Sequence, residues 1–494
     1  MSHGRGGLLV GLLGSGLLLC ATAAATSGLD LQEFDAFRRL WSDMAVGIDG
    51  FLDGRRPLPP EVEPVYTGAD GLDADQAYRR LVVKGTRNHA IRPWQFWRTL
   101  PDRPFLKTRI EPVPKHYDDH GRGRLLGLGF RLLRGIAPFL VVWLGALCCA
   151  PVLAWAAWEL TRAGYPVAAG ALAALLGLSC YWVETLALTR YAVGFYLIGL
   201  LLVVPLAAYS VLAPACSVRG LAARALLAGA GFALASTCRS SVGLVLPGLL
   251  LAVTLGAVRL QAARPRKVVL LLALTATLLL PFPAMRRAQQ SDIWQPLWEG
   301  LGDFDREKGY AWSDAEALLA VRAGGGRKLW TPGSESILRE AVLRDVRTDP
   351  AWYATILARR LVAVVLQTKL WPWAPRDGRS TSTSTSANEG VLDKYYGYTA
   401  TADHFGLGSA RLELPISLLL PPLPLLVFRA AAPRRLGWSE AGRTRARAAL
   451  RVVACVAAGA IVLPVLVTTA GGQETQAFAL VYLLSAALLL DVAR

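Results

Sequence analysis

The stretch YAVGFYLIGLLLVVPLAAYSVLA at residues 191–213 decides the class of protein to which this chain belongs. It contains no charged side chain, and a helix needs only about 20 apolar residues to cross the hydrocarbon core of a bilayer. Of the 494 residues, 53% are hydrophobic and 18% are charged, whereas about a quarter are charged in a typical soluble domain. The sequence therefore predicts an integral membrane protein embedded in the lipid bilayer, and it excludes an ordinary cytosolic enzyme.

Other apolar segments of similar length lie on both sides of this stretch. They predict an all-α polytopic membrane protein with about ten transmembrane helices, at residues 7–25, 136–158, 165–182, 191–213, 223–238, 241–258, 268–284, 412–428, 452–470 and 476–491. The first segment has two interpretations, because the small residues Ala21 to Ala25 resemble a signal-peptide cleavage site. We prefer an uncleaved anchor, since many spans follow it.

The spans divide the chain into five regions, two of which are long polar segments that we place outside the cytoplasm. Leu31, Phe34 and Phe37 recur at helical spacing in the first of these loops and predict an amphipathic helix there. The regions are an N-terminal transmembrane anchor (1–26), a first extracytoplasmic loop (27–135), a transmembrane bundle (136–284), a second extracytoplasmic region (285–411) and C-terminal transmembrane helices (412–494).

The positions of the basic residues predict the orientation of the chain. The formal net charge of +17 can be explained without a nucleic-acid partner, because basic cytoplasmic loops account for such an excess in membrane proteins. The segment 352–371 is ambiguous, since it is partly apolar but carries charges. If it crossed the membrane, the arginine-rich stretch 429–451 would lie outside, against the positive-inside rule. We therefore predict an interfacial helix at 352–371 and both termini in the cytoplasm.

Polar residues near the outer ends of the spans are candidates for ligand binding. Arg239, in Ser236-Thr-Cys-Arg-Ser-Ser241, lies between two closely connected spans, and a planar guanidinium suits phosphate oxygens. Arg190 is a second such arginine, although pairing with Glu184 is our preferred interpretation for it. Glu474 is a further polar group at an outer end. The alternative for all of them is a role as interfacial anchors or paired structural charges.

The familiar signatures of metal and nucleotide chemistry are missing from the sequence. The seven cysteines lie in or beside apolar segments without metal-ligand spacing, and no histidine motif of a zinc enzyme occurs. A phosphate-binding glycine loop and a serine nucleophile elbow are also absent from it.

The order of these regions resembles the GT-C superfamily, which consists of integral-membrane glycosyltransferases that use polyprenyl-phosphate sugars. The most specific stretch is DIWQPLWEGLGDF at residues 292–304, followed by GYAWSD at 309–314, and it is similar to a segment of predicted bacterial membrane proteins of this type. Ser236-Thr-Cys-Arg239 before a Leu- and Pro-rich span also resembles them. The resemblance is architectural over most of the chain and motif-like over about 25 residues.

This resemblance implies an inverting glycosyltransferase with a catalytic carboxylate in the first outer loop. The family's adjacent acidic pair soon after the first span is not present here, and the best substitute is Asp73-Ala-Asp75. A turn or helix cap is the alternative role for these two aspartates. Arg239, with Arg190, would hold the departing phosphate. The residues proposed to contact the sugar or other parts of the substrate are Trp294, Trp298, Asp303 and Glu474.

The resemblance leaves several points open. Some members of the superfamily use a divalent cation and others do not, and we assign no metal ligand. The expected partners are a polyprenyl-phosphate sugar and a glycan, lipid or protein acceptor, with the protein in a bacterial cell inner membrane. The alternative functions are a lipid-linked glycan flippase, polymerase or ligase that needs no first-loop carboxylate, and a noncatalytic assembly subunit.

Overall fold

The structure is a computed structural model of the whole chain, and most of the first predicted outer loop lies outside the part that it describes. The described residues are 2–27, 62–67, 109–114, 125, 138–178, 193–261, 264–281, 283, 293–302, 304, 307–311, 313–327, 329, 331–367, 405–407, 410–412, 422–432, 439–462, 466–467 and 473–494.

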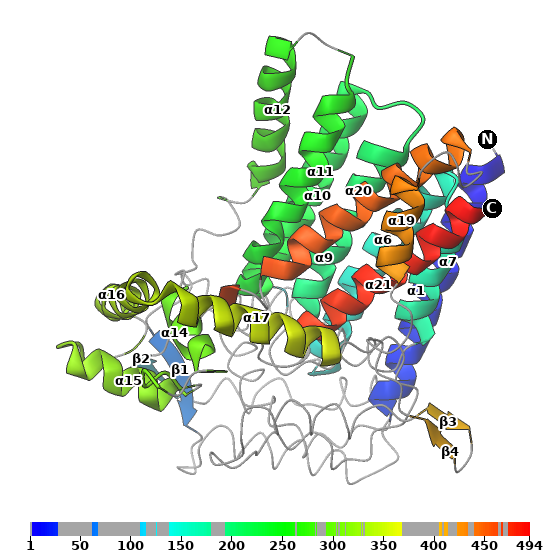
Figure 1. Cartoon of the computed structure of the whole chain (residues 1–494). Helices are drawn as coiled ribbons and strands as arrows, with labels where there is room; N and C mark the ends of the chain where they lie inside the picture. The colour runs from blue at the N-terminus through cyan, green and yellow to red at the C-terminus, as the bar shows by residue number, and fades with distance from the viewer. Residues whose placement is uncertain are drawn as a thin grey trace.

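The described chain forms a bundle of apolar helices around one central helix, α9 (Figure 1). α9 and the π-helix that continues it are almost entirely buried, as their lack of charge predicts. The elements of the bundle are α1 (Ser2–Ser27), α6 (Pro138–Arg162), α7 (Pro166–Leu178), α9 (Val193–Ala207), η2 (Ala208–Leu212), α10 (Val218–Cys238), η3 (Ser240–Val245), α11 (Leu246–Arg259), α12 (Arg264–Leu279), α19 (Pro422–Ala431), α20 (Glu440–Val462) and α21 (Gln473–Ala493).

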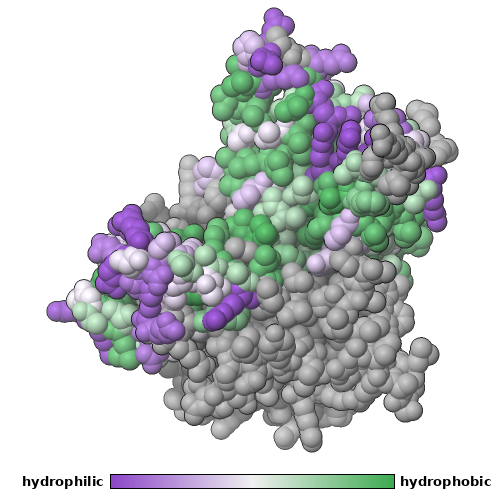
Figure 2. Space-filling model, in the orientation of Figure 1, coloured by the Kyte–Doolittle hydropathy of each residue, from purple (hydrophilic) through white to green (hydrophobic). Residues whose placement is uncertain are grey.

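The length and composition of these helices confirm a membrane protein. Within the described residues, five segments are long and apolar enough to cross a bilayer: Gly6–Ala23, Trp143–Arg162, Gly194–Leu212, Val218–Cys238 and Ser240–Arg259. Figure 2 shows apolar side chains over the flank of the bundle, where Val258, Val269 and Leu272 are more than 60% exposed. In a membrane protein lipid covers such a surface, whereas exposure of the same apolar side chains to water would be unfavourable. The total of about ten spans stays a prediction.

Two C-terminal helices differ from their predicted positions. α20 begins at Glu440, before the predicted span at 452–470, because Gly442, Ala446 and Ala449 form a buried stripe at helical spacing among the arginines. α19 has 10 residues and begins later than the predicted span at 412–428. At about 1.5 Å per residue, α19 alone reaches only halfway across a bilayer core.

A second group of helices lies beyond one end of the bundle (Figure 1). We call this group the outer unit: α14 (Trp294–Leu301), α15 (Asp314–Ala323), α16 (Pro332–Thr348) and α17 (Pro350–Gln367). The described membrane helices agree with the all-α prediction, and the described strands form two short antiparallel ribbons, β1 (Val62–Thr67) with β2 (Arg109–Pro114) and β3 (Phe405–Leu407) with β4 (Ala410–Leu412). α17 coincides with the predicted interfacial helix up to residue 367, and its position in the interface stays a prediction.

Both ends of the described chain lie at the opposite end of the bundle from the outer unit (Figure 1). The last turn of α21 joins the start of α7 there, because the Asp491 carboxylate accepts hydrogen bonds from the backbone N–H groups of Val167 (3.1 Å) and Ala168 (2.8 Å). Arg445 of α20 donates to the Asp491 carbonyl at 2.9 Å. The termini therefore share one side of the bundle, as the predicted topology requires.

α1 packs into the bundle through glycines. A Cβ atom added at Gly11 would lie 2.7 Å from the Cα of Ala154 in α6, and one added at Gly14 would lie 2.6 Å from the Cβ of Ala173 in α7. The buried Ser15 hydroxyl also donates to the Ala150 carbonyl at 2.8 Å. Small residues allow membrane helices to approach closely. The choice between a retained anchor and a removed signal peptide stays a prediction.

We predict that Gly11→Leu destabilises the protein, because the new side chain meets the backbone of α6. Overpacking of this kind costs about 1–3 kcal/mol, which in a chain of this length would lower the midpoint of thermal unfolding in detergent by about 1–3 °C. Gly16→Leu is the matched control, since nothing lies within 4 Å of a Cβ atom at Gly16. Equal unfolding midpoints for the two variants would contradict the packing of α1.

Candidate functional site

Arg239 lies at the end of α10 that faces away from the two termini. Its extended backbone (φ −155°, ψ 117°) ends the helix, and its N–H donates to the Ala235 carbonyl at 2.9 Å. Its carbonyl accepts from Val242 at 3.1 Å and thereby starts the short helix η3. The side chain extends from a turn that these two backbone hydrogen bonds define, and Arg239 as a residue is partly exposed.

The helix α14 belongs to the cores of both the bundle and the outer unit. Leu297 packs against the hydrophobic core of the bundle. The next residue, Trp298, is buried in a separate core with Leu301. Trp294 packs against the same outer core but stays partly exposed. The motif at residues 292–304 therefore joins the outer unit to the membrane helices.

An aromatic cluster forms the centre of the outer unit. The ring centroids of Trp298 and Tyr310 are 5.3 Å apart, and those of Tyr310 and Trp352 are 5.7 Å apart. The Tyr310 hydroxyl donates to the Asp345 carboxylate at 2.8 Å. Because Trp298 is only 5% exposed, its described surroundings are those of a core residue rather than an open sugar platform. Trp294 is the more accessible of the two tryptophans.

Helix caps orient α15, α16 and α17 around this cluster. Asp349 accepts the Trp352 N–H at 2.9 Å and thereby caps α17 just before Pro350, and it also pairs with Lys308 at 3.4 Å. These contacts hold the pKa of Asp349 below its ordinary value, the backbone hydrogen bond from Trp352 contributing most. Ser313 caps α15 through the Ala315 N–H. The reciprocal capping box occurs in α16, between Thr331 and Ser334.

Glu335 joins the start of α16 to the start of α14. Its two carboxylate oxygens accept the N–H groups of Trp294 (3.0 Å) and Gln295 (3.3 Å), which are otherwise left without partners at a helix N-terminus. Burial raises the pKa of Glu335 above 4.5, and the backbone hydrogen bonds oppose that rise only in part. The two helices therefore keep a fixed relation through a partly desolvated carboxylate.

Arg360 is the most unusual residue of the outer unit. It is 0% exposed and lies on the buried stripe of α17, between Ile356 and Val364. A Cβ atom added at Gly300 would lie 3.0 Å from the Arg360 guanidinium and 1.9 Å from the Val467 carbonyl. The absence of a side chain at Gly300 therefore allows both groups to approach α14 closely. Its neighbour Arg359 is exposed and donates to the Phe304 carbonyl at 3.4 Å. Buried charges close to a membrane are costly and are commonly retained for function.

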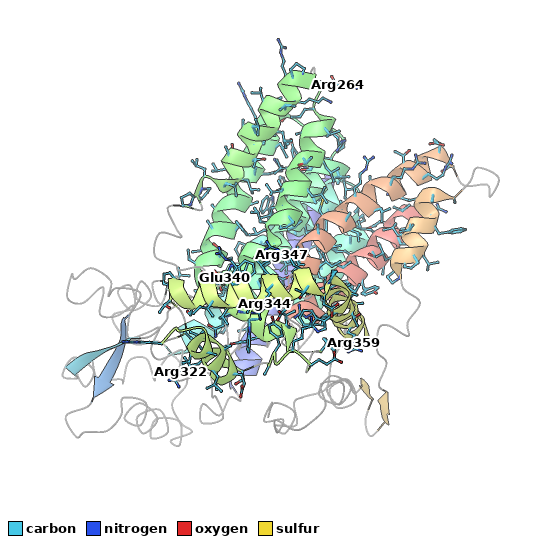
Figure 3. All side chains as sticks on the ribbon, turned by 60° about the vertical axis from the view of Figure 1, so that its left-hand side comes forward. Arg264, Arg322, Glu340, Arg344, Arg347 and Arg359 are labelled. Atoms are coloured by element: carbon cyan, nitrogen blue, oxygen red, sulfur yellow. The ribbon has the colours of Figure 1, made fainter. Side chains whose placement is uncertain are left out.

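Charged side chains cover the surface of the outer unit. Figure 3 shows Arg322, Arg344, Arg347 and Arg359 on its helices, together with Glu340, and Arg264 at the far tip of α12. Arg344 pairs with Asp345 at 2.9 Å. Burial alone would raise the pKa of Asp345, but the hydrogen bonds from Arg344 and Tyr310 outweigh it and hold the pKa below 3.8.

Of the predicted site residues that the structure describes, only Trp294 and Trp298 share an element. Arg239 ends a bundle helix, and Trp294 and Trp298 lie in α14 at the junction with the outer unit. Asp73, Asp75, Arg190 and Asp303 lie outside the described residues, and so does the side chain of Glu474 in the first turn of α21. Among the residues that are described, no three His, Cys, Asp or Glu side chains form a group that could hold a metal ion.

The sequence interpretation missed the roles of Arg360 and Glu335. The periodicity of Trp352, Ile356, Arg360 and Val364 was the available signal for Arg360, because it puts the charge on the apolar stripe. No local pattern marks Glu335, whose partners are about 40 residues away. Comparison with family models, with curated proteins and with solved structures found no match for this chain.

We predict that Glu335→Ala loosens α14, because two backbone N–H groups lose their acceptor. The expected cost is about 0.5–2 kcal/mol, as for other helix caps. Hydrogen–deuterium exchange of residues 294–301 should rise accordingly. Glu335→Gln keeps an acceptor and should exchange more slowly than the alanine variant. Glu340→Ala is the control, since Glu340 is exposed on the same helix. Faster exchange in all three variants would contradict a capping role.

The depressed pKa of Asp345 leads us to predict that the stability of the outer unit depends on pH. Because its pKa is depressed in the folded state, the carboxylate stabilises the fold above the unfolded-state pKa near 3.8. This contribution is lost as the pH falls through the folded-state value. Exchange of residues 332–348 should therefore rise below pH 3.8 in the wild type. Asp345→Asn should remove this rise in exchange. If the variant still shows the same rise below pH 3.8, other groups are responsible for it.

Proposed function

We propose that this protein is a glycosyltransferase of the GT-C type. It would move a sugar from a polyprenyl-phosphate donor to a glycan, lipid or protein acceptor on the outer face of a bacterial inner membrane. The observation that carries the proposal is Arg239, which ends α10 at the end of the bundle beyond which the outer unit lies (Figure 1). A lipid-linked donor presents its phosphate at such a boundary between hydrocarbon and water.

The two arginines suit the leaving group of this reaction. Departure of polyprenyl phosphate leaves negative charge on the phosphate oxygens, and fixed cations that face this charge lower the barrier. Arg239 is attached to a rigid turn rather than to a flexible loop, so little reorganisation is needed. Arg360 is added here to the sequence-based candidates Arg239 and Arg190. Because it is fully enclosed, it would add positive potential through the low-dielectric interior rather than contact the phosphate.

A carboxylate from the first outer loop would complete the reaction. Asp73 or Asp75 would take the proton of the acceptor hydroxyl as the acceptor oxygen bonds to the sugar carbon. The bond from that carbon to the phosphate oxygen breaks at the same time, which inverts the configuration. A positioned base contributes about 10²–10⁴-fold in rate. Trp294, Asp303 and Glu474 remain proposed substrate contacts, and Trp298 would position α14 from its core. A divalent cation on the donor phosphate is compatible with this scheme.

We predict that cells without this protein accumulate a polyprenyl-monophosphate sugar, measured by mass spectrometry of lipid extracts. The wild type should clear it. A double variant with Asp73→Asn and Asp75→Asn should fail to clear it, because the acceptor hydroxyl keeps its proton. Arg239→Gln should slow clearance by about 10²-fold or more, as for other removed donors to developing charge. Arg322→Gln is the control, since Arg322 is exposed on the outer unit.

Three results would contradict this proposal in whole or in part. Accumulation of longer diphosphate-linked glycans would indicate a flippase, polymerase or ligase. Full clearance by the double aspartate variant, at wild-type protein level, would exclude both carboxylates as the base. Equal effects of Arg239→Gln and Arg322→Gln would show that general surface charge, rather than the junction, matters.

A further inference from the structure

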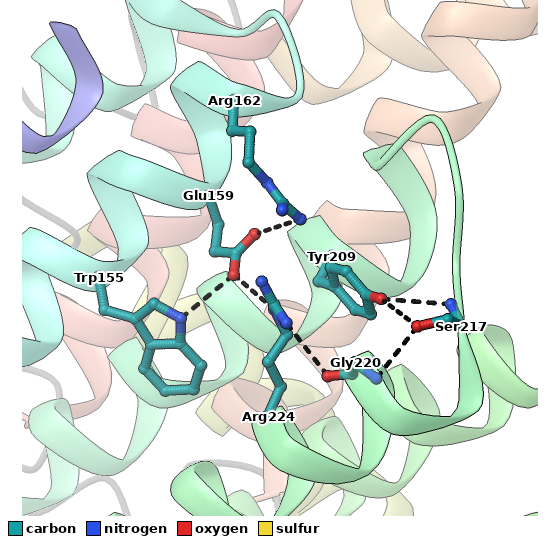
Figure 4. A network of polar contacts seen from close by, with 7 residues as sticks. All are labelled: Trp155, Glu159, Arg162, Tyr209, Ser217, Gly220 and Arg224. Atoms are coloured by element: carbon teal, nitrogen blue, oxygen red, sulfur yellow. Dashed lines mark hydrogen bonds and ion pairs between the residues drawn. The ribbon is translucent and has the colours of Figure 1, made fainter. Parts of the chain in front are cut away.

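The end of the bundle that carries the two termini contains a polar network unrelated to the proposed reaction (Figure 4). Its centre is Glu159 in the last turn of α6, which is 1% exposed. The carboxylate accepts the Arg224 Nε–H and lies 3.1 Å from Nη2 of Arg162. The indole N–H of Trp155 also donates to it at 3.3 Å. A carboxylate so deeply buried needs such partners.

The network holds more positive than negative charge. Glu159 is the one carboxylate that these described contacts contain, and it is shared by two arginines. Arg224 is the inner partner, since its side chain is 15% exposed and it also donates to the Gly220 carbonyl at 3.1 Å. Arg162 is 37% exposed. The surplus positive charge therefore lies at Arg162, toward the surface.

Aromatic rings fix both guanidinium groups in place. The guanidinium carbon of Arg224 lies 3.8 Å from the ring centroid of Tyr209, and that of Arg162 lies 5.0 Å from the ring centroid of Trp158. The Tyr209 hydroxyl accepts the Ser217 N–H at 3.2 Å and ties the π-helix η2 to the start of α10. A guanidinium held in one orientation loses little entropy when it binds an anion.

Further arginines surround the network without another carboxylate in their described contacts. Arg259 donates to the carbonyls of Ser210 (3.1 Å) and Ala213 (2.8 Å), so its charge adds to the local positive field. Arg219 is exposed in the first turn of α10. Deeper along α10, Leu226 and Leu227 are 44% and 56% exposed, as side chains that face acyl chains are. Positive charge next to exposed apolar side chains matches a lipid headgroup above its acyl chains.

We propose that Arg162, held by Glu159 and Trp158, binds the phosphate of an anionic phospholipid in the leaflet at this end of the bundle. Arg219 adds attraction at the surface, and α10 provides the apolar contact for the acyl chains. An acidic protein segment would use the same charges but would leave Leu226 and Leu227 uncovered. The site lies at the other end of the bundle from the proposed transferase site, and its test uses no transferase activity.

The test adds phosphatidylglycerol or phosphatidylcholine to the delipidated protein. Native mass spectrometry then measures how much of each lipid the protein retains. The wild type should retain phosphatidylglycerol in preference. Arg162→Gln should lower that retention by about tenfold, as expected for the loss of a charge-assisted hydrogen bond. The variant should fold normally, because Arg224 still pairs with Glu159. Equal unfolding midpoints in phosphatidylcholine nanodiscs check this point.

Arg266→Gln is the matched control, because it removes one exposed charge from the first turn of α12 at the same end of the bundle. Its retention of phosphatidylglycerol should equal that of the wild type. Equal losses in both variants, or no loss in Arg162→Gln, would overturn the proposal. A rise in the unfolding midpoint with inorganic phosphate alone, as large as with phosphatidylglycerol, would assign the site to a free anion and would also overturn it.

Discussion

A helix in hydrocarbon finds no water for its polar groups, and the rest of this structure follows from that constraint. The backbone hydrogen bonds of the spans must close within each segment, so the chain forms continuous helical segments such as α10, or α9 with the π-helix η2. Helix association then depends on close packing rather than on exclusion of water. The glycine contacts of α1 with α6 and α7 are an instance of this packing.

The same constraint moves most ionisable side chains to the two ends of the bundle, where they are held in different ways. At the end with the termini, Arg162 and Arg224 share one carboxylate and stack on aromatic rings, and Arg259 is bound by backbone carbonyls. At the other end, Arg360 is enclosed by packing against α14 and the chain at Val467. The first arrangement leaves charge accessible from the surface, and the second encloses it completely.

The parts of the fold that are set by local pattern could be predicted from the sequence. The apolar segments of the sequence correctly predicted the positions of α6, α7, α9, α10 and α11. α20 begins earlier than the predicted span, because its arginines lower the hydropathy of residues 440–451 although the residues between them are buried. The contacts of Glu335 and Arg360 depend on segments distant in sequence, and charge alone does not show whether a residue such as Arg360 is buried. The proposed base, Asp73 or Asp75, rests on sequence alone.

The place of α14 limits how the two parts of the protein can move. Leu297 and Trp298 are neighbours in the chain but belong to different cores, and Gly300 touches the chain before α21. A rigid tilt of the outer unit away from the bundle would expose one of these two apolar side chains to water. The carboxylate bridge from Glu335 also makes α14 and α16 move as one body. Any opening between the bundle and the outer unit must therefore come from segments on either side of α14 rather than from α14 itself.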